Sequence, residues 1–388
     1  MSDQFEQLKT DREYIDGKTD LIPAKDSRGK KIRKTILTVG FVALNIAVIL
    51  VTGIIEFTKD PQAAANIPFR DVNLLYLLIA GACLLAVLAL ETFKYYLMSL
   101  KTLGRANLRH SFEVAALGKY YDSITPSGAG GQPFQMYYLR KAGYSRGTAG
   151  SLPVLGFLTM QIGFVVVAAG IFIADLCGGF GTNTLGGYST TLRIPAYIGL
   201  VCYMLVPTAI ILFTIAPKQI TRLLRWFLRL GAKLRIVKDP AQKEETMLDS
   251  LNAYRESLRS MVKIRWLVPQ TLLIGILYQV ALCAIPFFVL RAFGGAGSFI
   301  DVFTLTVYIY AGITIIPTPG NAGAAEASFY AIFSVLTKNF LFWAMLVWRF
   351  LTYYSFLLIG VGIYGFRAWE NRGRKPAAEK AEDLPDEK

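Results

Sequence analysis

Six long apolar runs constrain this chain more than any other feature of its sequence. They cover residues 35–57, 72–99, 149–176, 194–216, 266–290 and 339–366. A run of about 20 apolar residues is long enough to cross a bilayer as a helix. Because hydrocarbon offers no hydrogen bonds to the backbone, a crossing segment must satisfy its own polar groups, as a helix does. The runs therefore predict an all-α polytopic membrane protein.

Two copies of the pattern Thr-Pro-x-x-Ala-Gly interrupt or border this apolar sequence. Proline and glycine break helices and leave backbone groups without partners. At membrane depth, such a break is tolerated only where it is buried in protein or lines a wet cavity. Broken segments at matching places in two halves indicate a transport site. The copies are Thr125, Pro126, Ser127, Gly128, Ala129, Gly130 and Thr318, Pro319, Gly320, Asn321, Ala322, Gly323.

The net charge of +14 comes from cations at the ends of the apolar runs, so the positive-inside rule explains it better than nucleic-acid binding does. Basic clusters at 101–109 and 140–146 both belong in the cytoplasm, yet only about 30 residues separate them. Two crossings need about 40 residues. We therefore expect 111–139 to enter the membrane and return; the alternative is an amphipathic surface segment. The N-terminus is placed inside by Lys25, Arg28, Lys30, Lys31, Arg33 and Lys34.

The second half of the chain leaves two topologies open. Basic residues in 217–265 and 367–375 place both segments inside. Either 301–316, 317–337 and 339–366 are three crossings, or 301–337 is one hairpin that enters from outside. We favour the hairpin, because it makes the second half an inverted copy of the first. The prediction is then six to eight transmembrane helices with broken, re-entrant hairpins in an inverted repeat.

The domain organisation follows from these segments. We expect a polar cytoplasmic tail at 1–34 with no cleavable signal peptide, and a charged, disordered cytoplasmic tail at 367–388. The membrane domain is 35–366, with halves at 35–216 and 266–366. The basic linker 217–265 joins them. Its stretch 219–236 has the spacing of an interfacial helix for anionic headgroups, or is an ordinary positive-inside cluster.

Each motif is followed by sequence that restarts as a helix, and a helix N-terminus suits an anion such as phosphate. Neutral donors there are Thr125, Ser127, Thr318 and Asn321. Close backbone approach is allowed by Gly128, Gly130, Gly131, Gly320 and Gly323. The alternative is that these small residues serve only tight helix crossings.

Charged residues within apolar sequence are the other candidates for the site. Glu326 follows the second motif, and Arg349 in the last run is its natural partner. The pair is either structural, or Glu326 faces a wet cavity and binds a cationic headgroup or a proton. Lys119 and Asp122 either line the same cavity or extend to the interface. Gln132 and Gln135 after the first motif are further polar candidates, whereas Glu91 and Lys94, one helical turn apart, are expected to form a local pair rather than a site.

No sequence pattern points to enzymatic chemistry. The motifs GxSxG, HExxH and the phosphate-loop lysine motif are absent from the sequence. His110 is the single histidine, and the four cysteines show no CxxC spacing. We therefore expect neither catalytic residues nor a cofactor nor a metal.

The segments YYDSITPSGAGGQPFQMYYLRKAGYS and IPTPGNAGAAEASFYAIF resemble the lysylphosphatidylglycerol synthase transmembrane family, the flippase-like membrane domain of MprF-type proteins. The resemblance covers roughly 35–366. It implies a bacterial plasma membrane, lipid substrates and a role in resistance to cationic peptides. Carried over by position, Thr125 to Gly130 and Thr318 to Glu326 are the substrate-cavity residues. The cytosolic domain that transfers lysine to phosphatidylglycerol in complete members has no counterpart here, so a separate protein would make the lipid.

The sequence thus favours a lipid translocase that moves a phospholipid, anionic or aminoacylated, between leaflets. Two alternatives stay open. One is a lipid-modifying enzyme of the phosphatidylglycerol lysyltransferase type, and the other is a secondary transporter of a small solute or ion.

Overall fold

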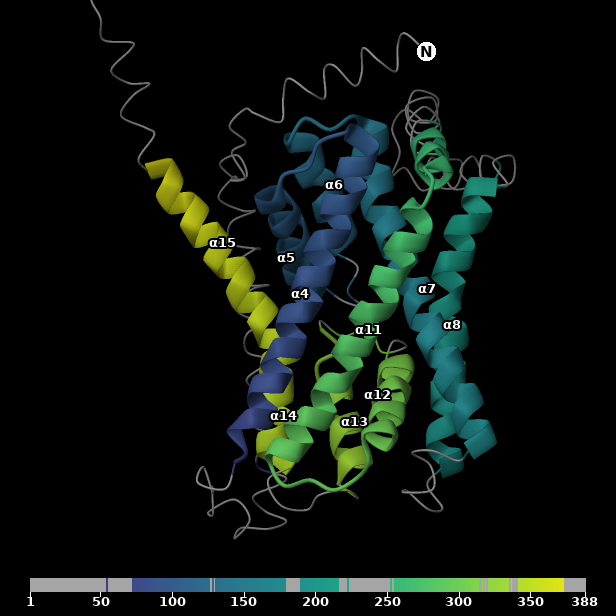
Figure 1. Cartoon of the computed structure of the whole chain (residues 1–388), viewed down its shortest axis with the longest axis vertical. Coiled ribbons are helices and arrows are strands. Elements are labelled where there is room, and N and C mark those ends of the chain that lie inside the picture. The colour runs from purple at the N-terminus through teal and green to yellow at the C-terminus, as the bar shows by residue number, and fades with distance from the viewer. Residues whose placement is uncertain are drawn as a thin grey trace, which may run out of the picture.

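The computed structural model describes residues 54, 72–125, 128, 130–178, 189–215, 222, 252, 255–313, 316, 318, 320–334, 336 and 341–372. The predicted span 35–57, except Ile54, the tail 1–34 and the stretch 219–236, except Arg222, lie outside these residues. Within the described residues every regular element is a helix (Figure 1).

Five long apolar helices confirm the all-α polytopic prediction. They are α4 (Leu74–Leu103), α7 (Arg146–Gly178), α8 (Ser189–Ile215), α11 (Leu267–Ala292) and the last span, which runs from α14 (Leu341–Arg349) through the π-helical turn η2 (Phe350–Tyr354) into α15 (Ser355–Arg372). All five coincide with predicted runs. The last helix continues past the expected end of its run at 366.

The first hairpin consists of α5 (Leu108–Ile124) and α6 (Gly131–Lys141). At 1.5 Å per residue these helices are about 26 and 17 Å long, so neither crosses a 30 Å core. The Gln135 side chain donates to the Val114 carbonyl over 3.1 Å, which holds the two arms together. Both arms lie in the upper half of Figure 1. The segment is therefore a re-entrant hairpin with its break at the first motif.

The second hairpin consists of α12 (Phe299–Ile313) and α13 (Ala324–Phe333). Its two ends meet, because the Ala296 amide donates to the Leu336 carbonyl over 3.2 Å. Both arms lie in the lower half of Figure 1, opposite the first hairpin. Of the two topologies left open, the structure adopts the hairpin. Two broken hairpins that enter from opposite ends, each followed by a span, form the inverted repeat.

The first spans of the two halves, α4 and α11, pack against each other in antiparallel directions (Figure 1). The Asn73 amide donates to the Ala292 carbonyl over 2.9 Å at one end. Lys101 donates to the Gln270 side chain at the other end. The pair is thus fastened at both ends.

Glycines set the crossing of α7 and α11. A Cβ on Gly163 would lie 2.7 Å from the carbonyl carbon of Gly275, and one on Gly275 would lie 2.7 Å from the Thr159 carbonyl oxygen. The backbones therefore touch directly, as small residues allow in membrane helix pairs.

Candidate functional site

The two breaks meet at an internal cavity of about 210 Å³. Gly128 comes from the first motif, and Gly320 and Asn321 come from the second. The rest of the wall comes from α5, α11, α12, α13 and the last span. These residues are Lys119, Asp122, Ser123, Tyr278, Leu282, Tyr310, Ile313, Ala325, Trp348, Arg349, Thr352, Tyr353 and Phe356.

Three of the wall residues carry a formal charge, namely Lys119, Asp122 and Arg349. The Lys119 Nζ lies 5.0 Å from the ring centroid of Tyr278, and the Arg349 guanidinium lies 4.7 Å from that of Tyr353. Aromatic faces of this kind attract cations without neutralising them. The wall therefore carries two cations, one carboxylate and several hydroxyls.

Glu326 holds Arg349 in place. Arg349 Nε donates to Glu326 Oε1 over 2.6 Å, and the Gly323 amide donates to Glu326 Oε2 over 2.7 Å. Arg349 also donates to the Gly320 carbonyl over 3.3 Å. The pair predicted from the sequence is therefore present, but Glu326 does not line the cavity. Both of its oxygens are engaged inside the protein, an arrangement that favours the structural alternative.

The first break is closed by its own side chains. The Gly131 amide donates to Asp122 Oδ1 over 2.8 Å, and the Gly130 amide donates to the Thr125 hydroxyl over 2.8 Å. Thr125 in turn donates to the Tyr121 carbonyl over 2.8 Å. These amides at the start of α6 are thus already bonded.

The second break is closed in the same way. The Thr318 hydroxyl donates to the Ala322 carbonyl over 3.0 Å, and the Gly323 amide donates to the Glu326 carboxylate. We expected free amides at both helix starts to hold a phosphate. At Gly130, Gly131 and Gly323 that expectation is not met, because a nearby acid or threonine of the same hairpin occupies each amide.

The part of the last span that lines the cavity contains a π-helical turn. The Ser355 amide bonds to the Phe350 carbonyl, five residues back, and the Ser355 hydroxyl bonds to the same oxygen over 2.7 Å. Such turns are frequent at functional sites in helices. Arg349, Thr352 and Tyr353 line the cavity along this stretch.

The residues predicted for the site divide into four groups. Gly128, Gly320, Asn321 and Arg349 line the cavity. Thr125, Gly130, Thr318, Gly323 and Glu326 support the breaks from behind the wall. Gln132 is half-buried on α6 and does not line the cavity, whereas Gln135 bonds to the Tyr95 hydroxyl over 2.8 Å. Pro126, Ser127 and Pro319 lie outside the described residues.

Sequence reasoning missed the aromatic wall. Tyr278, Tyr310 and Tyr353 lie in helices whose composition is that of ordinary membrane segments, so nothing in the local pattern marks their hydroxyls as part of a cavity. The sequence left open whether Lys119 and Asp122 line the cavity or extend to the membrane interface. The structure places both in the cavity wall.

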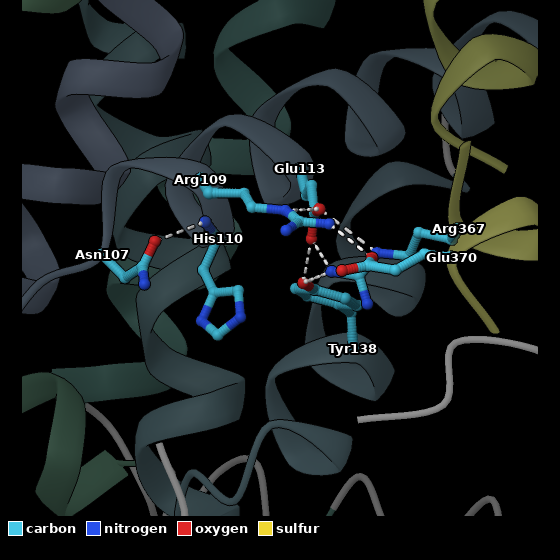
Figure 2. Close-up of polar contacts among 7 residues, drawn as sticks. All are labelled: Asn107, Arg109, His110, Glu113, Tyr138, Arg367 and Glu370. Atoms are coloured by element: carbon cyan, nitrogen blue, oxygen red, sulfur yellow. Dashed lines mark hydrogen bonds and ion pairs between the residues drawn. The ribbon is translucent and has the colours of Figure 1, made fainter. Parts of the chain in front are cut away.

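A second polar cluster lies away from the cavity, where α5 and α6 meet α15 (Figure 2). We call it the hairpin clamp; it consists of Arg109, Glu113, Tyr138, Arg367 and Glu370. The buried carboxylate of Glu113 accepts from Arg109 Nε over 3.3 Å, from the Tyr138 hydroxyl over 2.6 Å and from Arg367. Arg109 also donates to Glu370 over 2.7 Å. The clamp ties the first hairpin to the last span of the other half.

Fold and site together define a multi-pass helical membrane protein whose two inverted halves enclose a polar cavity. The lysylphosphatidylglycerol synthase TM region matches residues 37–360, and the chain belongs to this family. The chain is also similar to a UPF0104 membrane protein from Archaeoglobus fulgidus, with 24% identity over 320 residues. That match covers 80% of this chain and 92% of the relative. The family membership confirms the resemblance found in the sequence.

Proposed function

We propose that this protein is a lipid translocase that carries the phosphate-bearing headgroup of a phospholipid between the leaflets of a bacterial plasma membrane, with both termini in the cytoplasm. The observation that carries the proposal is the cavity between the two breaks, where Lys119 and Arg349 face the same space. Two cations in a low-dielectric wall suit a phosphodiester.

The size of the cavity supports a headgroup rather than a whole lipid. Its volume is about 210 Å³. Acyl chains would stay in the bilayer. Arg349 presents a planar donor fork and Lys119 a mobile ammonium, so a phosphate would contact Arg349 in fixed geometry and Lys119 adaptably.

The inverted repeat supports alternating access. One hairpin enters the membrane from each side, and the two helix breaks border the same cavity. Rocking of one half against the other would then open the cavity first to one leaflet and then to the other. The family suggests lysylphosphatidylglycerol or a related lipid as the natural cargo.

The experiment is reconstitution of the full chain into phosphatidylcholine vesicles with a trace of acyl-chain NBD-labelled phosphatidylglycerol. Dithionite bleaches only the outer leaflet, so translocation is measured as bleaching of the inner pool. We expect bleaching well above that of protein-free vesicles. A rate equal to that of empty vesicles would overturn the proposal.

A parallel arm separates lipid from soluble phosphate, because both carry the chemistry that the cavity recognises. Vesicles of the same composition receive radiolabelled inorganic phosphate, and its uptake is measured. We expect no uptake above empty vesicles. Uptake of phosphate together with a background rate of lipid bleaching would make the protein a small-anion transporter instead.

A further inference from the structure

A buried ion pair lies behind the cavity wall. Glu91 and Lys94 on α4 are 5% and 1% exposed, and Lys94 Nζ donates to Glu91 Oε1 over 2.8 Å. Lys94 also reaches the Gly156 carbonyl on α7 at 3.5 Å. The other carboxylate oxygen, Glu91 Oε2, is buried and accepts no hydrogen bond. Among the described residues it is the one buried carboxylate oxygen without a partner.

An unmet carboxylate oxygen in the interior is costly, because it has lost its water without gaining a donor. A group of this kind calls for an explanation, and a role in another state of the protein is one. A proton on Oε2 would neutralise the carboxylate and leave the positive charge of Lys94 to compensate an anion in the cavity. The atom is therefore suited to bind a proton when the surroundings become more negative.

The charges around the cavity are balanced while it is empty. Behind and within its wall are three cations and three carboxylates, whose formal charges cancel. These are Lys94, Lys119 and Arg349 on one side and Glu91, Asp122 and Glu326 on the other. A phosphodiester that entered would leave one negative charge uncompensated at membrane depth, which is costly. A proton bound with it restores neutrality.

Of the three carboxylates, Glu91 is the acceptor that the contacts favour. Asp122 Oδ1 caps the start of α6, and both oxygens of Glu326 are engaged by Arg349 and the Gly323 amide. Protonation of either Glu326 oxygen would break a contact that holds a hairpin together, and Asp122, unlike Glu91, has no buried oxygen without a partner. Protonation of Glu91 Oε2 breaks no hydrogen bond.

The groups that face Glu91 connect it electrically to the cavity. Lys119 and Asp122, both in the cavity wall, interact with the Glu91–Lys94 pair from α5. A negative charge placed beside Lys119 would therefore lower the electrostatic potential at Glu91 and favour its protonation. The ionisable groups around Glu91 are Lys94 and Tyr95 on α4, Lys119 and Asp122 on α5 and Tyr278 on α11, with the Arg349–Glu326 pair across the cavity.

We propose that translocation is proton-coupled, and that each phosphate-bearing headgroup in the cavity is accompanied by one proton bound to Glu91 Oε2. The inference rests on the proposed translocase function. The proton comes from water on the side where the headgroup enters and leaves with it, so the complex that crosses is neutral. Lys94 keeps its own proton and its contact with Oε1.

The test uses the NBD-phosphatidylglycerol vesicles with the medium one pH unit more acidic outside than inside. One proton per lipid makes the inner-to-outer ratio of the label tenfold at equilibrium, because a pH unit is a tenfold ratio of protons. Reversal of the gradient should invert the ratio. In Glu91→Gln we expect lipid exchange to continue with a ratio near one. The matched control is Glu256→Gln, the same change at an exposed position outside the cavity, which should keep the tenfold ratio.

The outcomes separate the two proposals. Fast lipid exchange in the unmodified protein with a ratio that ignores the gradient overturns proton coupling and leaves the translocase intact. Lipid exchange no faster than in empty vesicles overturns both. A tenfold ratio that survives in Glu91→Gln places the proton elsewhere and overturns the assignment of Glu91.

A second measurement needs no variant, in case Glu91→Gln does not fold. The unmodified protein in weakly buffered detergent is titrated with phosphatidylglycerol while a pH dye is read. We expect uptake of about one proton per lipid bound. Binding without proton uptake would overturn the inference.

Discussion

The Tyr353 hydroxyl donates a hydrogen bond to the Ser123 carbonyl over 3.3 Å, and this contact joins the last span to the end of α5 just before the first break. The same ring lies against Gly320 of the second break. One side chain of the last span therefore touches the second motif and the end of α5 two residues before the first motif, and the geometry of the cavity depends on it.

Gly320 should tolerate no side chain. Its φ is +57°, and a Cβ there would collide with the ring of Tyr353. We expect Gly320→Ala to destabilise the protein by about 1–3 kcal/mol, the cost of a strained backbone residue. Thermal unfolding in detergent measures this. Gly312→Ala is the matched control, because a Cβ at Gly312 in α12 meets nothing within 4 Å; that variant should be neutral or slightly stabilised. Equal unfolding temperatures for the two variants would contradict the prediction.

Arg349 should be needed both for stability and for transport. Arg349→Gln leaves the Glu326 carboxylate buried without its cation, which costs about 3–5 kcal/mol. In Glu326→Gln/Arg349→Gln no charge is left behind, so we expect most of that stability to return. Lipid exchange should be strongly reduced in both variants, because each lacks the cavity cation. A double variant that translocates lipid at the unmodified rate would show that Arg349 only serves the fold.

Lys119 should bind the headgroup through its charge. Lys119→Met removes a charge-assisted contact worth about 1.5–3 kcal/mol, so we expect roughly ten- to hundredfold weaker binding of phosphatidylglycerol. Lys119→Arg keeps the charge and should retain most of the affinity. Binding to the detergent-solubilised protein, followed by tryptophan fluorescence, distinguishes the variants. If Met and Arg weaken binding equally, shape rather than charge is what Lys119 contributes.

The hairpin clamp should hold α5 and α15 together. In Glu113→Gln the ion pairs of the buried carboxylate with Arg109 and Arg367 are lost. We expect destabilisation on the order of 3 kcal/mol and faster hydrogen exchange in α5 and α15. Tyr138→Phe removes one hydrogen bond to the same carboxylate and should cost only about 1 kcal/mol. Unchanged exchange in α15 of Glu113→Gln would show that the clamp does not fasten the two helices.

The broad architecture could be predicted because the bilayer imposes it. The runs at 72–99, 149–176, 194–216, 266–290 and 339–366 all coincide with long helices, since length and apolarity are decisive in lipid. The first hairpin followed from a distance argument, because too few residues lie between like-charged loops for two crossings. The second was favoured because it makes the second half an inverted copy of the first. The pairing of Glu326 with Arg349 was also predictable, as a lone charge at depth needs a partner.

The details of the site depend on contacts that local pattern does not contain. Asp122 reaches the Gly131 amide across nine residues of broken helix, and this bond occupies an amide that the sequence suggested for phosphate. Glu326 stands three residues after Gly323, the spacing at which a glutamate caps a helix, so that signal was present but open to two interpretations. The unmet oxygen of Glu91 is visible only once α4, α5 and α7 are packed.

The antiparallel pair of α4 and α11 is bonded near both of its ends, by Asn73 with Ala292 and by Lys101 with Gln270. Neither helix can slide along the other without breaking one of these bonds. The two helices therefore keep their relative position, and any rocking of one half against the other must pivot about this pair. Spin labels placed on α4 and α11 near either end of the pair should keep their separation through the transport cycle. Labels placed one at each broken motif should change theirs.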